Sequence, residues 1–246
     1  MEIYSNNEIS ARYLESACEN LNRVLREETG NIERGSKLLF ESYQNGGHFY
    51  AFGTGHSHMI AEELYTRAGG YAPVRAILPP EFMLHEMVNK STHLERLSGY
   101  AAHLLDLYNV QSADVLLIIS NSGRNAVPVE MAMLAKEKGC GVIAITSVAH
   151  SRSVAPRAGI GKKVFELADV VLDNKAVPGD AGFAISGLDT LMGPTSTITG
   201  AALVNALVIS FVKKLVDSGI EPPVFKSSNL DGADKYNKYL FDTFCK

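Results

Sequence analysis

The sequence has few cysteines and no run of basic residues, and each shortage narrows the functions open to it. Its 246 residues include only three cysteines, Cys18, Cys140 and Cys245, which lie far apart and show no paired spacing. This predicts neither a disulfide framework nor a zinc site, and it favours the reducing compartment of the cytoplasm. The formal net charge is -4 and the basic residues are scattered, so we expect no nucleic-acid partner.

Segments that would place the chain in a membrane are also lacking. The first six residues do not have the basic and apolar regions of a signal peptide. The longest apolar stretch, residues 198–212, contains Thr199, Asn205 and Ser210, and it is short for a bilayer span. We interpret it as a buried helix and expect no membrane partner.

The glycine motifs of nucleotide-binding proteins are absent as well. No Gly-Lys-Ser/Thr occurs, which excludes a P-loop. Gly53 and Gly55 begin like a dinucleotide fingerprint, but the third glycine is missing and no acidic residue follows the next strand. A nucleotide-dependent enzyme is therefore disfavoured, and we expect no cofactor. His56 and His58 could bind a metal, but no third ligand stands at a suitable spacing, so we expect no metal site.

One βαβ unit stands out in what the sequence does contain. Residues 114–119 and 142–145 are short, β-branched and apolar, as strands covered by helices on both sides must be. Residues 127–138 between them have a helical period and carry Pro128 in the first turn. The unit predicts two parallel strands joined by a helix.

The corner between the first strand and the helix is rich in hydrogen-bond donors. It reads Ser120-Asn121-Ser122-Gly123-Arg124-Asn125. Backbone N–H groups at a helix start attract anions, and the hydroxyl and guanidinium groups add donors where a phosphate would lie. The alternative is an ordinary polar loop in which serine and asparagine cap the helix.

A second corner of the same kind lies upstream. Residues 48–53 predict a strand, Thr54-Gly55-His56-Ser57-His58 a turn, and residues 59–68 a helix. Glycines let the backbone approach a ligand closely, and the hydroxyls of Thr54 and Ser57 are further donors.

Together these two corners resemble those of the sugar isomerase (SIS) domain found in phosphosugar enzymes and sensors. A third element, residues 193–197 opening the helix of residues 198–212, resembles the Ser/Thr-rich helix start of that family. The resemblance covers roughly residues 35–215. It is closest to stand-alone SIS proteins related to N-acetylmuramic acid 6-phosphate etherases and phosphoheptose isomerases. It implies a flavodoxin-like three-layer αβα sandwich with a central parallel sheet.

The resemblance also implies the layout of the chain and its ligand. We expect a single SIS domain over residues 1–246, with its core at residues 46–218 and a tail at residues 219–246. Two helices are predicted in the leading segment of residues 1–45, at residues 8–28 and 31–44. In this interpretation they form a dimerisation element, so we expect a homodimer or a higher homo-oligomer. The alternative is that they are a simple helical cap on the same chain. The substrate is a sugar phosphate, held by Gly53, Thr54, Gly55, His56, Ser57, Ser120, Asn121, Ser122, Gly123, Arg124, Ser147, Ser196 and Thr197.

Acid–base chemistry on such a sugar needs a carboxylate and an imidazole. The segment between a second strand predicted at residues 73–78 and the strand at residues 114–119 supplies candidates from a short helix at residues 81–87 and a longer one at residues 92–108. Glu95 is the candidate base, because it falls near the position of the etherases' catalytic glutamate. His85 is the candidate ring-opening acid, and Glu62 and Glu86 are alternates. For each of them, a solvated or satisfied side chain is the competing interpretation.

Two functions therefore remain open. One is a phosphosugar isomerase or an etherase-like lyase, and the other is a sensor that binds sugar phosphate without turnover. A helix-turn-helix would support a sensor of the transcription-factor type, but the leading helices are acidic near Glu27 and Glu28. This favours the enzyme without excluding a sensor that acts through a protein partner.

Overall fold

Five parallel strands form the central sheet of the protein, in a computed structural model that describes residues 6–87 and 89–245. The strands are β1 (Phe49–Gly53), β2 (Val74–Ile77), β3 (Val115–Ile119), β4 (Gly141–Thr146) and β5 (Val170–Asp173). They lie in the order β2-β1-β3-β4-β5. All neighbouring pairs are parallel, which confirms the flavodoxin-like arrangement that the sequence predicts.

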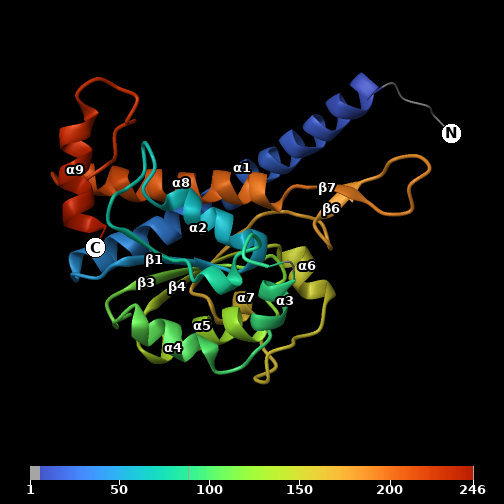
Figure 1. The fold of residues 1–246 in the computed structure, drawn as a ribbon, viewed down its shortest axis with the longest axis horizontal. Coiled ribbons are helices and arrows are strands. Elements are labelled where there is room, and N and C mark those ends of the chain that lie inside the picture. Colours follow the sequence, from blue (N-terminus) through green and yellow to red (C-terminus); the bar gives the residue numbers. More distant parts are fainter. Residues whose placement is uncertain (1–5, 88, 246) are drawn as a thin grey trace.

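Helices cover both faces of this sheet and make a three-layer sandwich (Figure 1). One face carries α1 (Asn6–Gln44), α2 (His58–Leu64) and α8 (Ser196–Asp217), and the other carries α4 (Tyr100–Leu107), α5 (Ala126–Glu137) and α7 (Val164–Leu167). Along β3, Leu117 packs in the first core and Leu116 and Ile118 in the second. Every residue of β3 is buried, which explains the unbroken apolar run.

Shorter elements complete the fold. They are two 3₁₀ turns, η1 (Gly55–Ser57) and η2 (Pro80–Phe82), the helices α3 (Lys90–Leu94), α6 (Val148–Ser153) and α9 (Ala233–Phe244), and the strands β6 (Ala181–Phe183) and β7 (Met192–Pro194). The last two pair as an antiparallel hairpin that projects from the body beside the leading part of α1 (Figure 1). Tyr13 of α1 donates its hydroxyl to the carbonyl of Pro194 at 3.1 Å, which fastens the hairpin to the helix.

The leading segment is one helix, so the prediction of two helices was wrong. Helix α1 continues through Gly30, and a Cβ added there would meet nothing within 4 Å. A mid-helix glycine lowers helix stability by about 1 kcal/mol relative to alanine. Packing against α8 and the sheet outweighs that penalty, because tertiary contacts rather than propensity carry most helical stability.

Two predictions in the segment after β2 also need correction. Residues 81–87 do not form a helix; only the turn η2 is present there. The helix predicted at residues 92–108 is split into α3 and α4 by residues 95–99, and Gly99, the N-cap of α4, takes a left-handed φ of 89°. Glu95 is thus the C-cap residue of α3 rather than a residue on the face of a long helix.

The strand order places a crevice at the carboxyl ends of β1 and β3. Helix α2, which follows β1, lies on one face of the sheet, and α5, which follows β3, lies on the other. The two connections leave the sheet in opposite directions, and ligands of such sheets bind at this switch point. Both donor-rich corners of the sequence open onto it.

Within the described residues, α8 is the one helix long and apolar enough to cross a membrane by length and composition, which is weak evidence by itself. Leu203, Leu207 and Phe211 on its inner side belong to the core. This agrees with the interpretation of residues 198–212 as a buried helix.

Candidate functional site

The predicted corners meet in one small cavity at the carboxyl end of the sheet. Its volume is about 90 Å³. It is lined by His56, Ser57, Ile60, Ile119, Asn121, Asn174, Asp180, Ser196 and Thr197. Five of these, from three separate parts of the chain, are residues that the sequence predicts as substrate contacts. The fold therefore brings together segments up to about 140 residues apart.

The turn after β3, residues 120–126, presents a row of unpaired backbone donors. The hydroxyl of Ser120 accepts the N–H of Gly123 at 3.1 Å and closes the turn. Gly123 takes a left-handed φ of 57°, which favours glycine. In the described part of the chain, no acceptor pairs with the N–H groups of Asn121, Ser122, Arg124, Asn125 and Ala126. A run of free amides at a helix start is a concave site for an anion.

Arg124 adds positive charge to this turn. Its Nε is buried and makes no hydrogen bond, and no carboxylate of the described residues lies within 4 Å of its guanidinium group. Burial and the charge of Arg124 hold the pKa of the neighbouring His150 below its ordinary value. The backbone of Arg124 is fixed, because its carbonyl accepts the N–H of Arg157 at 2.9 Å. A guanidinium without an internal partner suits an anionic ligand.

Glu95 joins the two corners. Its carboxylate accepts the hydroxyl of Thr54 at 2.6 Å and the side-chain amide of Asn125 at 2.7 Å. Its carbonyl accepts the N–H of Val127, in the first turn of α5, at 3.0 Å. Burial raises the pKa of Glu95, and the hydrogen bond from Thr54 opposes this most strongly. The predicted base therefore stands beside both corners, with an environment that favours its protonated form.

The other titratable candidates gather on α2 and the segment after η2. The buried ring of His58 bonds through Nδ1 to the carbonyl of Gly55 and faces the exposed carboxylate of Glu62 through Nε2 at 3.5 Å. The exposed ring of His85 lies 6.4 Å from that of His58, centroid to centroid. A carbonyl oxygen only accepts, so Nδ1 of His58 is the donor in this bond and Nε2 is the nitrogen that faces Glu62. Glu86 is also exposed, and its carboxylate lies 3.8 Å from the ammonium of Lys90.

Two predicted contacts have hydroxyls that are already engaged inside the protein. The hydroxyl of Ser147, which is fully buried, donates to the carbonyl of Ala176 at 2.5 Å and accepts the N–H of His150 at 3.0 Å. It is the N-cap of α6, which favours capping over substrate contact. Thr54 is 6% exposed, and its hydroxyl donates a hydrogen bond to Glu95.

The start of α8 holds a residue that the sequence analysis did not find. Asp180, sixteen residues before Ser196, accepts the N–H groups of Thr195 at 3.1 Å and Ser196 at 2.9 Å. Its second oxygen accepts the hydroxyl of Ser196 at 2.5 Å. A carboxylate of the protein thus occupies the helix start where we expected a phosphate. No local pattern announces this contact, because it depends on how residues 174–195 fold back onto α8.

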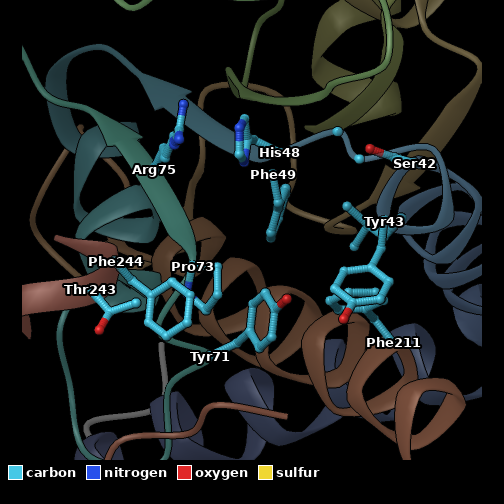
Figure 2. Close-up of a pocket in the computed structure, with 13 residues that line it drawn as sticks. Ser42, Tyr43, His48, Phe49, Tyr71, Pro73, Arg75, Phe211, Thr243 and Phe244 are labelled. Carbon is cyan, nitrogen blue, oxygen red and sulfur yellow. The ribbon is translucent and has the colours of Figure 1, made fainter. Parts of the chain in front are cut away.

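Larger cavities lie elsewhere. One of about 370 Å³ lies at the amino end of the sheet, between β1, β2 and the ends of α1 and α9. Figure 2 shows its aromatic side, formed by rings such as Phe49, Tyr71 and Phe244, and the side chains of His48 and Arg75 that point away from those rings. None of the predicted site residues lines it. The donors and titratable groups, rather than the volume, locate the candidate site.

No group of three or more His, Cys, Asp and Glu side chains is arranged to hold a metal ion among residues 6–87 and 89–245. The chemistry available at the crevice is that of amides, hydroxyls, Glu95 and the histidines.

Comparison with known proteins supplies the family. The family model described as "SIS domain" matches residues 12–147. The chain is 54% identical to UPF0309 protein BH3325 of Halalkalibacterium halodurans, over 93% of this chain and 96% of that protein. It is 40% identical to a UPF0309 protein of Geobacillus thermodenitrificans, over 95% of this chain and 94% of that protein.

Solved structures share the fold at low identity. Phosphoheptose isomerase GmhA from Neisseria gonorrhoeae superposes with a TM-score of 0.57 at 16% identity, over 85% of this chain and 100% of that one. The NanR protein of Vibrio vulnificus, solved in complex with ManNAc-6P, superposes with a TM-score of 0.52 at 17% identity, over 86% of this chain and 64% of that one.

Proposed function

The chain belongs to the SIS-domain family, and on this premise we propose that it binds a phosphorylated sugar at the carboxyl ends of its strands and converts it by acid–base chemistry. The observation that carries the proposal is the row of unpaired amides in residues 120–126. The N–H groups at a helix start have no intrahelical partner, and one bound anion can accept several of them at once.

In this proposal the phosphate lies against the turn of residues 120–126. The amides of Ser122, Arg124 and Ala126 donate to its oxygens, and the hydroxyl of Ser122, which has no internal partner, adds another donor. The guanidinium of Arg124 supplies the countercharge. Each such bond is charge-assisted and contributes about 1.5 to 3 kcal/mol. His56, Ser57 and Asn121 line the cavity beside the turn and contact the sugar.

Glu95 is the base in this proposal. Isomerisation moves a proton between adjacent carbons of the sugar, and elimination removes one next to the leaving group, so both reactions use the same carboxylate. The pKa of Glu95 is raised by burial, which strengthens it as a base and lets it return the proton. His85, with His58 and Glu62 beside it, is the acid that opens the ring or protonates the leaving group.

The second candidate is a sensor that binds sugar phosphate without turnover. One observation favours it: both carboxylate oxygens of Glu95 already accept hydrogen bonds, from Thr54 and Asn125. A carboxylate held in this way also serves as a purely structural brace between the two corners. The NanR protein of Vibrio vulnificus, which shares this fold, was solved in complex with ManNAc-6P.

Three further features complete the proposal. The protein works in the cytoplasm, in line with three cysteines that are all free thiols. It uses neither a metal nor an organic cofactor. It forms a homodimer or a higher homo-oligomer through α1 and α8, which share an apolar groove of about 330 Å³.

Ligand-dependent unfolding tests the binding step. Purified protein is heated with sugar phosphates, amino and N-acylated hexose phosphates included, and with their unphosphorylated parents. A ligand at a hundred times its dissociation constant adds about 2.7 kcal/mol to the stability of the folded state. We expect stabilisation by phosphorylated sugars alone, and turnover of the hit in NMR spectra. If no sugar phosphate stabilises the protein, the phosphate site is refuted.

Two variants separate binding from turnover. Arg124→Gln should weaken binding of the hit by about ten- to a hundredfold, as expected for the loss of 1.5 to 3 kcal/mol. Glu95→Gln should bind it and turn over at least a hundredfold more slowly, within the range for general acid–base catalysis. Glu137→Gln, at the exposed end of α5, is the matched control and should behave as the wild type. Full turnover by Glu95→Gln would remove Glu95 from the chemistry, and binding without turnover in the wild type would favour the sensor.

A further inference from the structure

The carboxylate of Asp180 fills the anion position at the start of α8. It takes three donors at once: the N–H groups of Thr195 and Ser196 and the hydroxyl of Ser196. Thr195, the N-cap residue, makes no capping bond with its own side chain. The helix start is therefore satisfied by a residue that reaches back from another segment, in the way that a bound anion would satisfy it.

Asp180 is held in an unfavourable backbone conformation. Its φ is 69°, in the left-handed region, and it follows Gly179 at φ 83°. Aspartate enters this region more readily than most residues, but the conformation still lowers stability relative to an extended one. The three hydrogen bonds to α8 offset this strain. The position of the Asp180 side chain against α8 therefore depends on those hydrogen bonds rather than on the backbone preference of aspartate.

The cavity that Asp180 lines is too small for a sugar phosphate, although its other lining residues could contact one. Its volume is about 90 Å³. Sites for small molecules usually measure about 300–1,000 Å³. His56, Ser57 and Asn121 face the same space as Asp180. Withdrawal of the Asp180 side chain would enlarge the cavity and free the donors of Ser196 together.

Asp180 stands at the base of the β6–β7 hairpin, which shares no strand pairing with the central sheet. The hairpin projects from the body (Figure 1) and its two strands pair only with each other. Leu188, Leu191 and Met192 near its far end are 47–50% exposed. Its contacts with the body include the ring of Tyr13 against Phe183, the hydroxyl of Tyr13 on the carbonyl of Pro194 and the N–H of Gly179 on Nδ1 of His150. The residues of both strands are exposed or half-buried, and segments that bury little surface open locally at a lower free energy than core elements.

We propose that Asp180 is an internal anion that keeps the α8 side of the site closed, and that the phosphate of a bound sugar replaces it on Ser196. The inference rests on the proposed function, because it needs a phosphate at residues 120–126. That phosphate carries more charge than a carboxylate and is already held by the amides of the turn. It gains the amide and hydroxyl of Ser196 when the side chain of Asp180 turns away from α8.

The test compares Asp180→Ala with the wild type. Dissociation constants for inorganic phosphate and for the sugar phosphate found by thermal shift are measured by titration calorimetry. The variant lacks the competing carboxylate, so we expect about tenfold tighter binding, the amount that corresponds to the net free energy of one or two hydrogen bonds. Its melting temperature without ligand should fall, because α8 loses its cap. Tighter binding with lower stability is the signature of a competing internal ligand.

Two further variants and one spectrum complete the test. Asp189→Ala, at an exposed position of the same hairpin, is the matched control and should change neither quantity. Asp180→Asn keeps a hydrogen-bond acceptor without the charge, so its phosphate affinity and its melting temperature should lie between those of wild type and Asp180→Ala. A folding defect in the alanine variant therefore does not decide the result. In the wild type, phosphate should shift the amide resonances of Thr195 and Ser196.

The outcomes separate this inference from the function on which it rests. If wild type and Asp180→Ala bind phosphate equally and the Ser196 resonance does not move, Asp180 is only a cap and the inference fails, whereas the phosphate site stands. If neither protein binds any phosphate compound, the proposed function fails and the inference with it. Tighter binding by Asp180→Ala together with the shift of Ser196 supports both.

Discussion

At the scale of single residues, Glu95 has the environment of a group that changes its protonation state. Two neutral donors, Thr54 and Asn125, are its hydrogen-bond partners, and burial raises its pKa more than those bonds lower it. A purely structural carboxylate is more often paired with a cation. No salt bridge of Glu95 occurs in the described residues, although Arg96 and Arg157 are near enough to favour its charged form.

The pKa of Glu95 gives a prediction about stability and pH. An unfolded glutamate titrates near about 4.3. Because the folded pKa is higher, the folded chain keeps a proton that the unfolded chain has lost, and wild-type stability falls as pH rises through this window. Glu95→Gln abolishes that term. We expect the free energy of unfolding of the variant, relative to wild type, to rise with pH between about 4 and the folded pKa, as measured by urea unfolding.

Glu137→Gln, with an exposed carboxylate, is the control and should differ from wild type by a constant amount over the same pH range. A flat difference for Glu95→Gln too would mean that the carboxyl of Glu95 titrates normally. The case for it as a tuned base would then be lost.

The sequence singles out Glu95 and the corner residues as candidates, but it does not show what they touch. Hydroxyl and amide side chains after a buried strand predict a polar corner, whichever group they finally hydrogen-bond to. Whether Ser147 faces a ligand or caps α6 depends on Ala176, nearly thirty residues away. The role of Asp180 depends in the same way on a contact across a loop, so no pattern of neighbouring residues could reveal it.

At the scale of elements, a buried lysine ties α1 to the end of β5. The ammonium of Lys175 lies 2.6 Å from the carboxylate of Glu28, 3.0 Å from Glu27 and 3.1 Å from Asp173. The adjacent Asn174 donates its side-chain amide to that of Asn121 in the turn after β3 at 3.0 Å. The charge cluster thus positions a loop that in turn supports the candidate phosphate site.

Lys175→Met should therefore destabilise the protein strongly. Glu28 is 2% exposed, and among the described residues Lys175 is the one cation within 4 Å of its carboxylate. Breaking a buried pair in this way lowers stability by about 3 kcal/mol or more, measured by urea unfolding. Lys37→Met removes an exposed lysine of α1 that is 3.7 Å from Glu41, and should change stability by less than about 0.5 kcal/mol. Equal effects of the two substitutions would contradict the cluster's role.

The strands and long helices were predictable because their apolar periods are set by burial in the layers. The sequence patterns did not predict that α1 is one continuous helix, and they did not predict the two short strands β6 and β7. Helix α1 passes Gly30 because α8 packs against it, whereas α3 ends at Leu94 and a new helix, α4, begins after Gly99. The strands β6 and β7 have only three residues each and are largely exposed, so they lack the buried alternation that predicts a strand.

At the scale of the whole molecule, α1 and α8 leave an apolar surface open. Leu25 is 65% exposed and Ile209 is 69% exposed, and a groove between the two helices is lined by Leu21, Ala202 and Ala206 among others. Single exposed apolar residues are normal, but a groove flanked by several is typical of an interface. Helix α8 is apolar on both its buried and its exposed side. This fits a helix that packs on its own sheet with one side and on a second chain with the other.

A charge placed on this surface should separate the subunits. We expect the wild type to sediment as a dimer or larger species at micromolar concentration, and Leu25→Glu and Ile209→Glu each to weaken association at least tenfold, because a carboxylate would be buried without a partner. Both side chains are exposed in the single chain, so the fold should survive. Leu107→Glu, on α4 across the sheet and 79% exposed, is the control. A monomeric wild type, or dissociation by Leu107→Glu instead, would place α1 and α8 outside any interface.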